Sequence, residues 1–277
     1  MERPSFRSTI HGHAGMTAVD TNHSTSAGRW LRIFVFYIIA IGFSIAARLY
    51  WHANDATAGW PTPSAIFRHL LSGIGPFIGA FVVWTAFRHP RRITFCGTSP
   101  TLAWTMLAVP AATIATLGVP NPYGIAPHLF GLFLGAWIAV YAILEETGWR
   151  GYLQDELCDH PPLRKYAIVG LFWYPWHLTF LQHHTITNEL AIFTLIILAS
   201  IGIGFVADRT KSIFAASAFH AAGNILGLTA YFTIFIPSSQ TRLAIAGICI
   251  AVWIVLLRIW RKRTLSNRQV AAGPVLT

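Results

Sequence analysis

The sequence is poor in charged residues. Only 11% of its 277 residues are Asp, Glu, Lys or Arg, whereas 54% are hydrophobic and 14% are aromatic. An ordinary soluble domain carries about 25% charged residues. The low charge and high hydrophobicity therefore exclude an ordinary soluble domain. A helix needs about 20 mainly apolar residues to cross the hydrocarbon core of a bilayer, and segments of that kind recur along most of the chain. We therefore expect an all-α, polytopic membrane protein.

Eight segments are long and apolar enough to be candidate transmembrane helices. They cover residues 31–51, 65–87, 101–119, 127–148, 166–182, 190–207, 212–236 and 242–260. No internal repeat and no long polar linker divides them. We expect one transmembrane domain over residues 30–263, a flexible polar tail over residues 1–29, and a C-terminal tail over residues 264–277.

Cysteine is scarce, and the first residues contain no apolar core segment. Three cysteines, two of them expected near helix ends, imply no disulfide framework. The polar first 28 residues do not resemble a cleavable signal peptide. Their histidines, His11, His13 and His23, are expected to be solvated rather than to bind a metal.

The basic residues are distributed unevenly between the two sides of the expected bundle. The formal net charge is +10, and all of the 20 Lys and Arg except Arg48, Arg68 and Arg242 fall on the side of the N-terminus. Basic residues are retained in the cytoplasm, so both termini are expected to be cytoplasmic in the cell inner (plasma) membrane. The charge therefore indicates topology and contact with anionic lipid, not binding of nucleic acid. The excess of Arg over Lys weakly indicates a bacterial source.

Glu145 and Glu146 directly follow an apolar run that is long enough to cross a bilayer. If this helix continues to about Gln154, as the absence of Pro permits, Glu145 lies at membrane depth. Glu146 and Arg150 are four residues apart and can form an ion pair, whereas Glu145 points about 100° away and is left for another partner. The alternative is a helix end whose charges lie among the lipid headgroups.

Two other expected spans carry histidine. His177 follows Trp173 by one helical turn, with Pro175 between them, and on its own is more often a hydrogen-bonded core residue than a catalytic one. His220 and Asn224 are four residues apart and share one helix face. The Ala and Gly residues between them are explained by close helix packing, but the His and Asn are not.

The depths of these residues agree with one another. At a rise of about 1.5 Å per residue, Glu145, His177 and His220 lie at a similar distance below the cytoplasmic face. We therefore expect Glu145, His177, His220 and Asn224 to line one cavity that admits water from the cytoplasm. Ionisable residues inside a membrane are costly and usually functional.

Three motifs support a family resemblance. The segment EETGWR fits EExxxR, WYPWH fits FxxxH with Trp173 in place of Phe, and HAAGN fits HxxxN, in this order on separate apolar segments. The chain resembles the CPBP family of intramembrane endopeptidases, which includes the type II CAAX prenyl proteases and the bacterial Abi proteins. The resemblance covers about residues 127–227.

The resemblance implies proteolysis with a role for each motif residue. Glu145 would be the general base, His177 would orient the attacking water, and His220 and Asn224 would stabilise the oxyanion. Glu146 and Arg150 match the remaining motif positions and would form a supporting ion pair. The replacement of Phe by Trp173 is conservative because both are aromatic, and it affects the shape of the pocket more than the chemistry.

A metal mechanism is the alternative to this glutamate mechanism. Glu145, His177 and His220 are also the residue types of a catalytic Zn²⁺ site. The helical zinc signature with two His four apart is absent from the sequence. A zinc site would also leave only Glu146 as general base, so no cofactor is expected.

Other functions are compatible with a polar cavity in a membrane protein. A non-catalytic immunity or scaffold protein would bind a peptide or a partner helix there. A transporter would use Glu and His to relay protons, but two matching halves with broken helices are not visible. The expected partner is a membrane-associated peptide or protein, and the sequence does not decide whether it is prenylated. Asp155, Glu156 and Asp159 are expected in a solvated acidic loop, and His183 and His184 at the outer interface.

Overall fold

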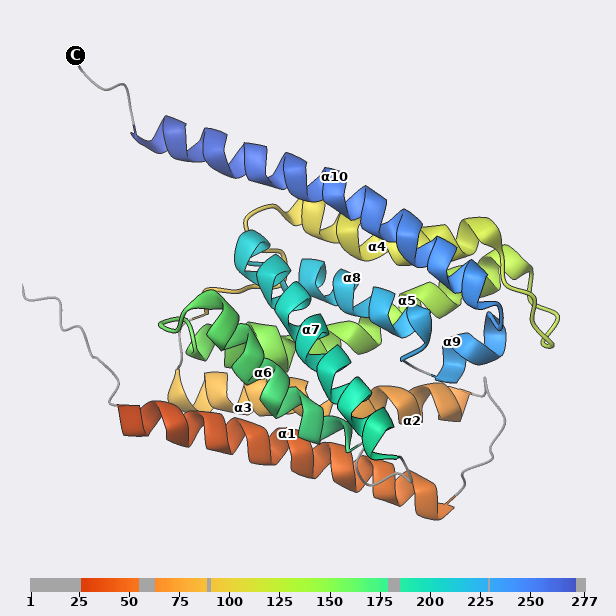
Figure 1. The fold of residues 1–277 in the computed structure, drawn as a ribbon, viewed down its shortest axis with the longest axis horizontal. Coiled ribbons are helices and arrows are strands. Elements are labelled where there is room, and N and C mark those ends of the chain that lie inside the picture. The colour runs from red at the N-terminus through yellow and green to blue at the C-terminus, as the bar shows by residue number, and fades with distance from the viewer. Residues whose placement is uncertain (1–25, 55–62, 89–90, 179–184, 229, 273–277) are drawn as a thin grey trace, which may run out of the picture.

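The computed structural model describes residues 26–54, 63–88, 91–178, 185–228 and 230–272. Within them the chain is helical, and its only strand-like pairing is an isolated parallel bridge between Thr94 and Ser212. The expected all-α bundle is confirmed (Figure 1). In chain order the helices are α1 Ser26–Asn54, α2 Pro63–Gly73, α3 Gly75–Phe87, α4 Pro100–Leu117, α5 Pro127–Gly148, η1 Trp149–Gln154, α6 Pro162–His177, α7 Ile186–Thr210, α8 Ile213–Gly223, η3 Asn224–Leu228, α9 Ala230–Phe235 and α10 Ser239–Ala272.

The expected count of eight spanning helices is not confirmed. Among the described residues, five helices are long and apolar enough to cross a membrane, or six if the bent pair α2 and α3 is one span. α6 and α8 are shorter, with 16 and 11 residues. The protein is nevertheless a multi-pass membrane protein, as its composition predicted. The division at residues 263 and 264 stays a prediction, although α10 continues as a helix to Ala272.

α5 and α8 occupy the interior of the bundle. In Figure 1, α4 and α10 lie on one side of them, α1 and α3 lie on the opposite side, and α6 and α7 cross in front. Half of the spanning window of α5 is buried in the protein, compared with 22% for α1 and 28% for α10. The segment that carries the adjacent glutamates is therefore shielded from lipid by its neighbours.

Glycine allows the central helices to approach closely. A Cβ atom at Gly135 of α5 would lie 2.4 Å from the Cα atom of Ala111 in α4, and one at Gly148 would lie 2.6 Å from the carbonyl oxygen of Pro76 in α3. Small residues bring helix backbones into van der Waals contact in membranes, where no hydrophobic effect drives helices together. These contacts fix α5 against both of its neighbours.

Three of the expected spans are broken or shortened at identifiable residues. α2 and α3 meet at a bend of 49°, where Pro76 occupies the first turn of α3. The expected span 212–236 is divided into α8, η3 and α9, with Gly227 at φ 115°. The expected span 166–182 ends as a helix at His177, because Pro175 lies in its last turn and Leu178 adopts the left-handed conformation. Residues 179–184, which include His183 and His184, lie outside the described residues, as does the tail with His11, His13 and His23.

The helix of the two glutamates continues past them, as expected. α5 passes directly into the π-helical segment η1, and together they form an apolar span of 28 residues from Pro127 to Gln154. Glu145 and Glu146 are therefore inside a helix, not at its end. Single π turns within α-helices frequently occur at functional sites.

The expectation of a solvated acidic loop after this helix is wrong for two of its three residues. Asp155 and Glu156 are buried. The Asp155 carboxylate accepts a hydrogen bond of 2.7 Å from the backbone N–H of Arg92, and Glu156 pairs with Arg32 of α1 at 2.5 Å. Asp159 is exposed and pairs with Arg29. Hydrogen bonds from the Cys158 thiol and the Arg29 guanidinium hold the pKa of the Asp159 carboxyl below its usual range. Arg29 and Arg32 thus connect α1 to the segment that follows η1.

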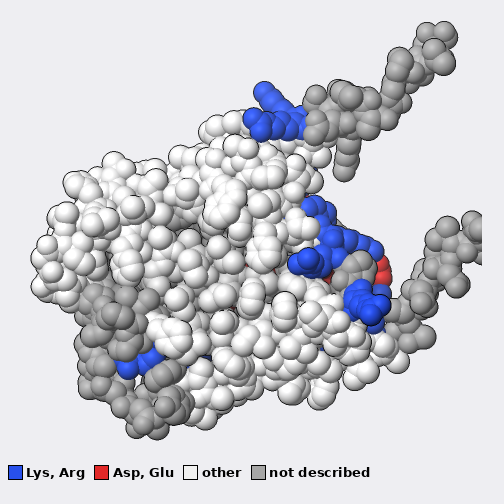
Figure 2. Space-filling view, turned by 180° about the vertical axis from the view of Figure 1, so that it is seen from behind, with Lys and Arg blue, Asp and Glu red and all other residues white. Residues whose placement is uncertain are grey.

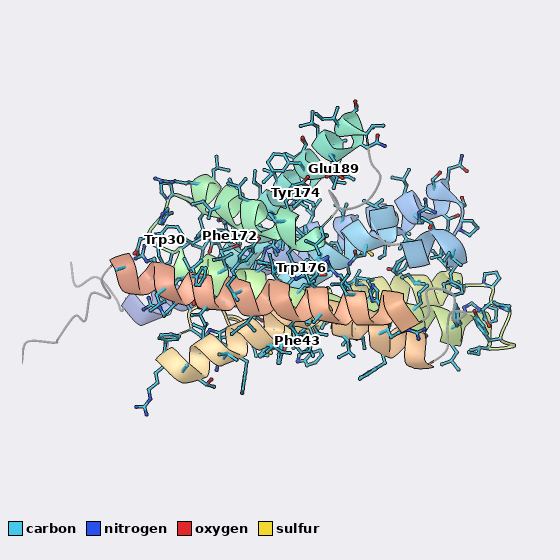
Figure 3. The ribbon with its side chains drawn as sticks, turned by 90° about the horizontal axis from the view of Figure 1, so that it is seen from below. Trp30, Phe43, Phe172, Tyr174, Trp176 and Glu189 are labelled. Atoms are coloured by element: carbon cyan, nitrogen blue, oxygen red, sulfur yellow. The ribbon has the colours of Figure 1, made fainter. Side chains whose placement is uncertain are left out.

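Lys and Arg gather at one end of the bundle, with an almost uncharged surface over the helices beside it (Figure 2). The α7–α8 turn at this end is fixed by a loop between α3 and α4. The backbone N–H of Thr94 donates to the carbonyl oxygen of Lys211 at 2.9 Å, and the N–H of Ile213 donates to that of Thr94 at 2.9 Å. We call the end of the bundle where these Lys and Arg gather, which includes Lys211 of the α7–α8 turn, the basic end of the protein. Tyr174 of α6 donates to the Glu189 carboxylate of α7 at 2.6 Å and so joins these two helices (Figure 3).

The close contact at Gly135 gives a test of the packing. Gly135→Ala places a methyl group against the backbone of α4, and overpacking of this kind typically costs about 1–3 kcal/mol. Gly42→Ala is the matched control, since a Cβ at Gly42 of α1 has no neighbour within 4 Å. We expect Gly135→Ala to lower the thermal unfolding midpoint in detergent and Gly42→Ala to leave it unchanged. Equal effects would contradict the described packing of α4 on α5.

Candidate active site

Glu146 is fully buried and has two basic partners. Its Oε1 atom accepts a hydrogen bond of 2.9 Å from Nη1 of Arg150, one turn later in η1. The same oxygen contacts Nδ1 of His220 in α8 at 2.7 Å. The ion pair of Glu146 and Arg150 expected from their spacing is present in this structure, and His220 joins it from another helix.

Arg150 is held on every side by contacts within the protein. Its Nη2 atom donates to the hydroxyl oxygen of Ser200 in α7 at 3.3 Å, and that hydroxyl donates to the carbonyl oxygen of Tyr166 at 2.8 Å. The guanidinium carbon lies 4.6 Å from the ring centroid of Trp173, a cation–π distance. This arginine therefore connects η1 to both α6 and α7.

Glu145 is buried like its neighbour but points to a different set of groups. Its Oε2 atom accepts a hydrogen bond of 3.0 Å from the indole Nε1 of Trp173. The hydroxyl of Tyr141, one turn earlier in α5, is a second hydrogen-bond partner. Both are neutral donors. The two adjacent carboxylates thus have different environments, because successive residues of a helix point about 100° apart.

The Trp173 ring lies beside both imidazoles of the site. Its centroid is 5.2 Å from that of His177 and 5.3 Å from that of His220. Nδ1 of His177 lies 2.9 Å from the carbonyl oxygen of Trp173 and so carries the proton, which leaves Nε2 as an acceptor. Arg48 of α1 donates to the carbonyl oxygen of Trp176 at 2.8 Å and so secures the end of α6 that bears His177.

Asn224 begins the second π-helical segment, one turn after His220. Its side chain is buried, and its amide nitrogen Nδ2 has no hydrogen-bond partner among the described residues. Oε2 of Glu146 and Nε of Arg150 share this property. A buried polar atom without a partner costs about 1–3 kcal/mol, so such atoms in a native site point to a ligand, a substrate group or ordered water.

The residues that the motifs singled out occupy one region of the bundle. Direct contacts join Glu145, Glu146, Arg150, Trp173, His177 and His220 into one cluster. The contact between His220 and Glu146 was not expected from the sequence, which paired His220 only with Asn224 at the oxyanion site. Three cavities of the described surface are lined by other residues, so the water-filled pocket around Glu145 stays a prediction.

Sequence reasoning missed three supporting residues. Tyr141 precedes Glu145 by four residues, a spacing that places both on one helix face and was a usable signal. Ser200 and Arg48 lie on other helices, and no local pattern connects them with the site. The His69 ring of α2 stacks on Tyr141 with centroids 4.1 Å apart, so α2 also reaches this cluster.

The described geometry does not decide between the glutamate and the zinc mechanism. Among the described residues, no three side chains of His, Cys, Asp or Glu are grouped so that they could hold a metal ion. Nδ1 of each histidine is engaged with an oxygen of the protein. Nε2 of each ring is left for another partner, as in histidines that bind zinc, so the choice between the glutamate and the zinc mechanism stays a prediction.

The central part of the chain matches a known protein family. Residues 126–226 match a family model described as "Type II CAAX prenyl endopeptidase Rce1-like". The matched segment contains all three motifs and every side chain of the cluster except those on α1 and α2. No curated protein matches the chain. The resemblance inferred from the motifs is confirmed.

The two carboxylates are expected to differ in their effect on stability. Glu146→Gln removes the negative charge that faces Arg150 and His220, and breaking a buried ion pair typically costs about 3–5 kcal/mol. Glu145→Gln retains an oxygen that accepts from Trp173 and should cost far less. Unfolding of both variants in detergent micelles measures the difference. The assignment of Glu146 as the structural member would be wrong if Glu145→Gln were the more damaging change.

Proposed function

We propose that this chain, whose residues 126–226 match the Rce1-like family model of type II CAAX prenyl endopeptidases, hydrolyses a peptide bond of a membrane-associated protein or peptide. The observation that carries the proposal is that the two adjacent glutamates have different bonding partners. Glu146 is taken up by Arg150 and His220, whereas Glu145 is held by the neutral donors Trp173 and Tyr141. Glu145 has neither of these cationic groups as a hydrogen-bond partner and is therefore the carboxylate that we assign to the substrate water.

In the proposed first step, Glu145 removes a proton from a water molecule as the oxygen attacks the carbonyl carbon of the scissile bond. The Trp173 indole fixes the orientation of the carboxylate through the hydrogen bond to Oε2. Nε2 of His177, unprotonated in the described tautomer, is available to accept a hydrogen bond from the same water. A general base that holds its water in place contributes typically about 10²–10⁴-fold to the rate.

The negative charge that develops on the carbonyl oxygen needs donors. Asn224 is proposed as the first, since its buried Nδ2 has two N–H groups and no partner among the described residues. His220 is proposed as the second, through Nε2. The Glu146 carboxylate on Nδ1 stabilises positive charge on this ring, as a buried carboxylate does for the histidine of other hydrolases.

The tetrahedral intermediate then collapses. The C–N bond breaks, and the proton held by Glu145 passes to the leaving nitrogen, so that one water is consumed and the glutamate regains its charge. No cofactor takes part in this sequence. If purified protein contained stoichiometric zinc, with activity lost to a chelator and restored by zinc, the glutamate mechanism would have to be replaced.

The substrate is proposed to reach the site from the membrane. The basic end is proposed to be cytoplasmic, with both termini on that side in the inner membrane, because basic residues are retained there. Prenylation of the substrate is left to experiment. A non-catalytic immunity or scaffold function remains the second candidate, favoured only by the polar atoms of the cluster that lack partners.

The catalytic role of Glu145 is tested by protein termini in cells. Membrane proteomes of strains carrying the wild-type chain or Glu145→Gln are compared, with Asp159→Asn as the control because its carboxylate is exposed in a loop. We expect a set of new termini with the wild type and the control that is absent with Glu145→Gln. Termini that persist in the Glu145→Gln strain would favour the scaffold function.

The role of Asn224 is tested by measuring the cleavage rate and the unfolding midpoint of one variant separately. Removal of one oxyanion donor typically lowers the rate about 10²–10³-fold, so Asn224→Ala should nearly abolish appearance of the same termini. Its unfolding midpoint should change little, because the amide nitrogen makes no hydrogen bond among the described residues. A variant that unfolds easily but cleaves at the normal rate would contradict the role.

A further inference from the structure

A concave site lies at the basic end, between the end of α7 and residues 254–265 of α10. It has a volume of about 570 Å³. Phe205, Arg209, Ile254, Leu257, Arg258 and Arg261 are among its lining residues. We propose that this groove, which we call the α7–α10 groove, binds one anionic phospholipid, with its phosphate among the three arginines and its acyl chain along the apolar wall.

The three arginines of the groove are available for an anion. No ion pair within the described residues uses Arg209, Arg258 or Arg261. Guanidinium groups bind phosphate oxygens through pairs of parallel hydrogen bonds, and several converging on one spot make a phosphate site. The groove therefore has the charge of a phosphate receptor.

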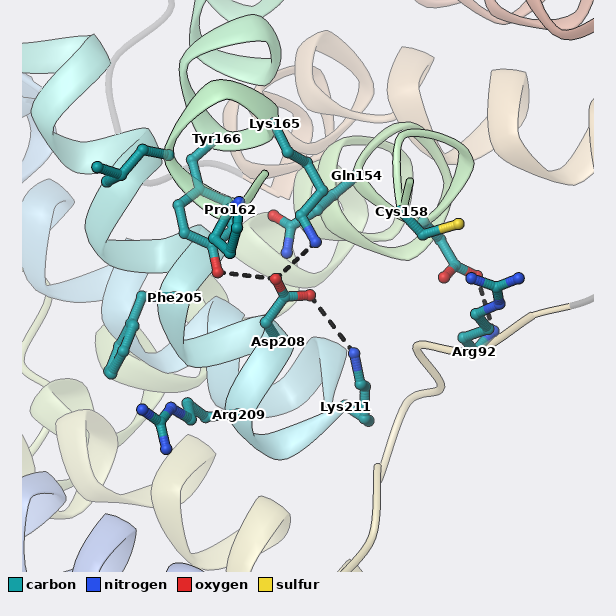
Figure 4. Close-up of a pocket in the computed structure, with 12 residues that line it drawn as sticks. Arg92, Gln154, Cys158, Pro162, Lys165, Tyr166, Phe205, Asp208, Arg209 and Lys211 are labelled. Atoms are coloured by element: carbon teal, nitrogen blue, oxygen red, sulfur yellow. Dashed lines mark hydrogen bonds and ion pairs between the residues drawn. The ribbon is translucent and has the colours of Figure 1, made fainter. Parts of the chain in front are cut away.

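The carboxylate in the groove does not neutralise these arginines. Asp208 accepts from Lys165 at 2.6 Å and from the Tyr166 hydroxyl at 2.7 Å, and lies 3.5 Å from Lys211. Figure 4 shows these three partners around Asp208, while Arg209 extends to the other side with Phe205. The Arg209 guanidinium lies 5.1 Å from the Phe205 ring centroid, so an aromatic face and not an acid supports it.

The wall of the groove suits a hydrocarbon chain. Phe205 and Ile254 are 47% and 45% exposed. Ile254 lies one turn before Arg258, within the apolar part of the span Ser239–Leu265. A single ligand that touches both parts must combine an anionic head with an apolar tail.

A second cavity continues the charge around Arg209. It has a volume of about 490 Å³, shares Phe205, Asp208 and Arg209 with the groove, and adds Arg92, Lys165 and Lys211. The region thus attracts anions beyond the three arginines. Basic pockets between transmembrane helices at the cytoplasmic side are sites for anionic lipid headgroups, and each nearby Lys or Arg strengthens that attraction.

The apolar wall decides between a lipid and other anions. A free phosphate or a soluble acidic peptide would use the arginines but leave the exposed Phe205 and Ile254 without a partner. A phosphatidylcholine molecule would cover the wall but bring no net negative charge. An anionic phospholipid satisfies both parts of the groove.

The test uses the purified full chain and native mass spectrometry, with phosphatidylglycerol and phosphatidylcholine added in equal amounts. The wild type is expected to retain phosphatidylglycerol preferentially. The variant Arg209→Gln, Arg258→Gln, Arg261→Gln should bind it at least about tenfold more weakly. The control Arg164→Gln, Lys262→Gln, Arg263→Gln removes the same charge from exposed positions outside the groove and should retain the preference.

A second variant keeps all the charge and fills the apolar wall. Ile254→Trp should also lose phosphatidylglycerol while its unfolding midpoint stays near that of the wild type. Equal losses in the groove variant and the charge control would overturn the proposal, because they would indicate general attraction alone. Equal retention of the two lipids, or displacement of phosphatidylglycerol by millimolar inorganic phosphate, would overturn it as well.

Discussion

The buried charges of Glu146, Arg150 and His220 constrain the rest of this protein. Taking these groups out of water costs several kcal/mol per ion unless each finds partners of excellent geometry. Here one carboxylate oxygen accepts from both basic groups, and Ser200 and the Trp173 ring hold the far side of Arg150. Helices α5, α6, α7 and α8 must therefore meet at one level of the bundle. A small displacement of any of them would leave a charge without its partner.

This constraint also explains why two glutamates stand side by side. A single carboxylate cannot serve as anchor for a cationic network and remain a base, because an ion pair with a cation favours the charged form of the carboxylate. Successive side chains of a helix point about 100° apart. Glu146 therefore points toward Arg150 and His220, whereas Glu145 points toward Trp173. Trp173 stands where the family motif has Phe, and its indole N–H supplies a hydrogen bond that Phe cannot make.

Much of this arrangement was accessible from the sequence. Local rules sufficed for the apolar segments, the continuation of α5 through Glu146 and the pairing of residues four apart, since these depend on helical geometry alone. The end of α6 at His177 and the division of the expected span 212–236 depend on Pro175 and Gly227, whose effect a composition window averages away. The partners Ser200 and Arg48 come from distant segments, and only the fold brings them to the site. Asp155 and Glu156 were expected in solvent because a sequence does not reveal that the backbone N–H of Arg92 and the side chain of Arg32 bind them.

The central claim is that Glu146 and Arg150 act as one buried unit on which the site is built. A double-mutant cycle with Glu146→Gln and Arg150→Met, measured as the free energy of unfolding in detergent micelles, tests it most directly. We predict a coupling energy of about 2 kcal/mol or more between the two positions, since partners in one buried charge network are strongly non-additive. Effects that add to within about 0.5 kcal/mol, as they do for independent sites, would contradict the account.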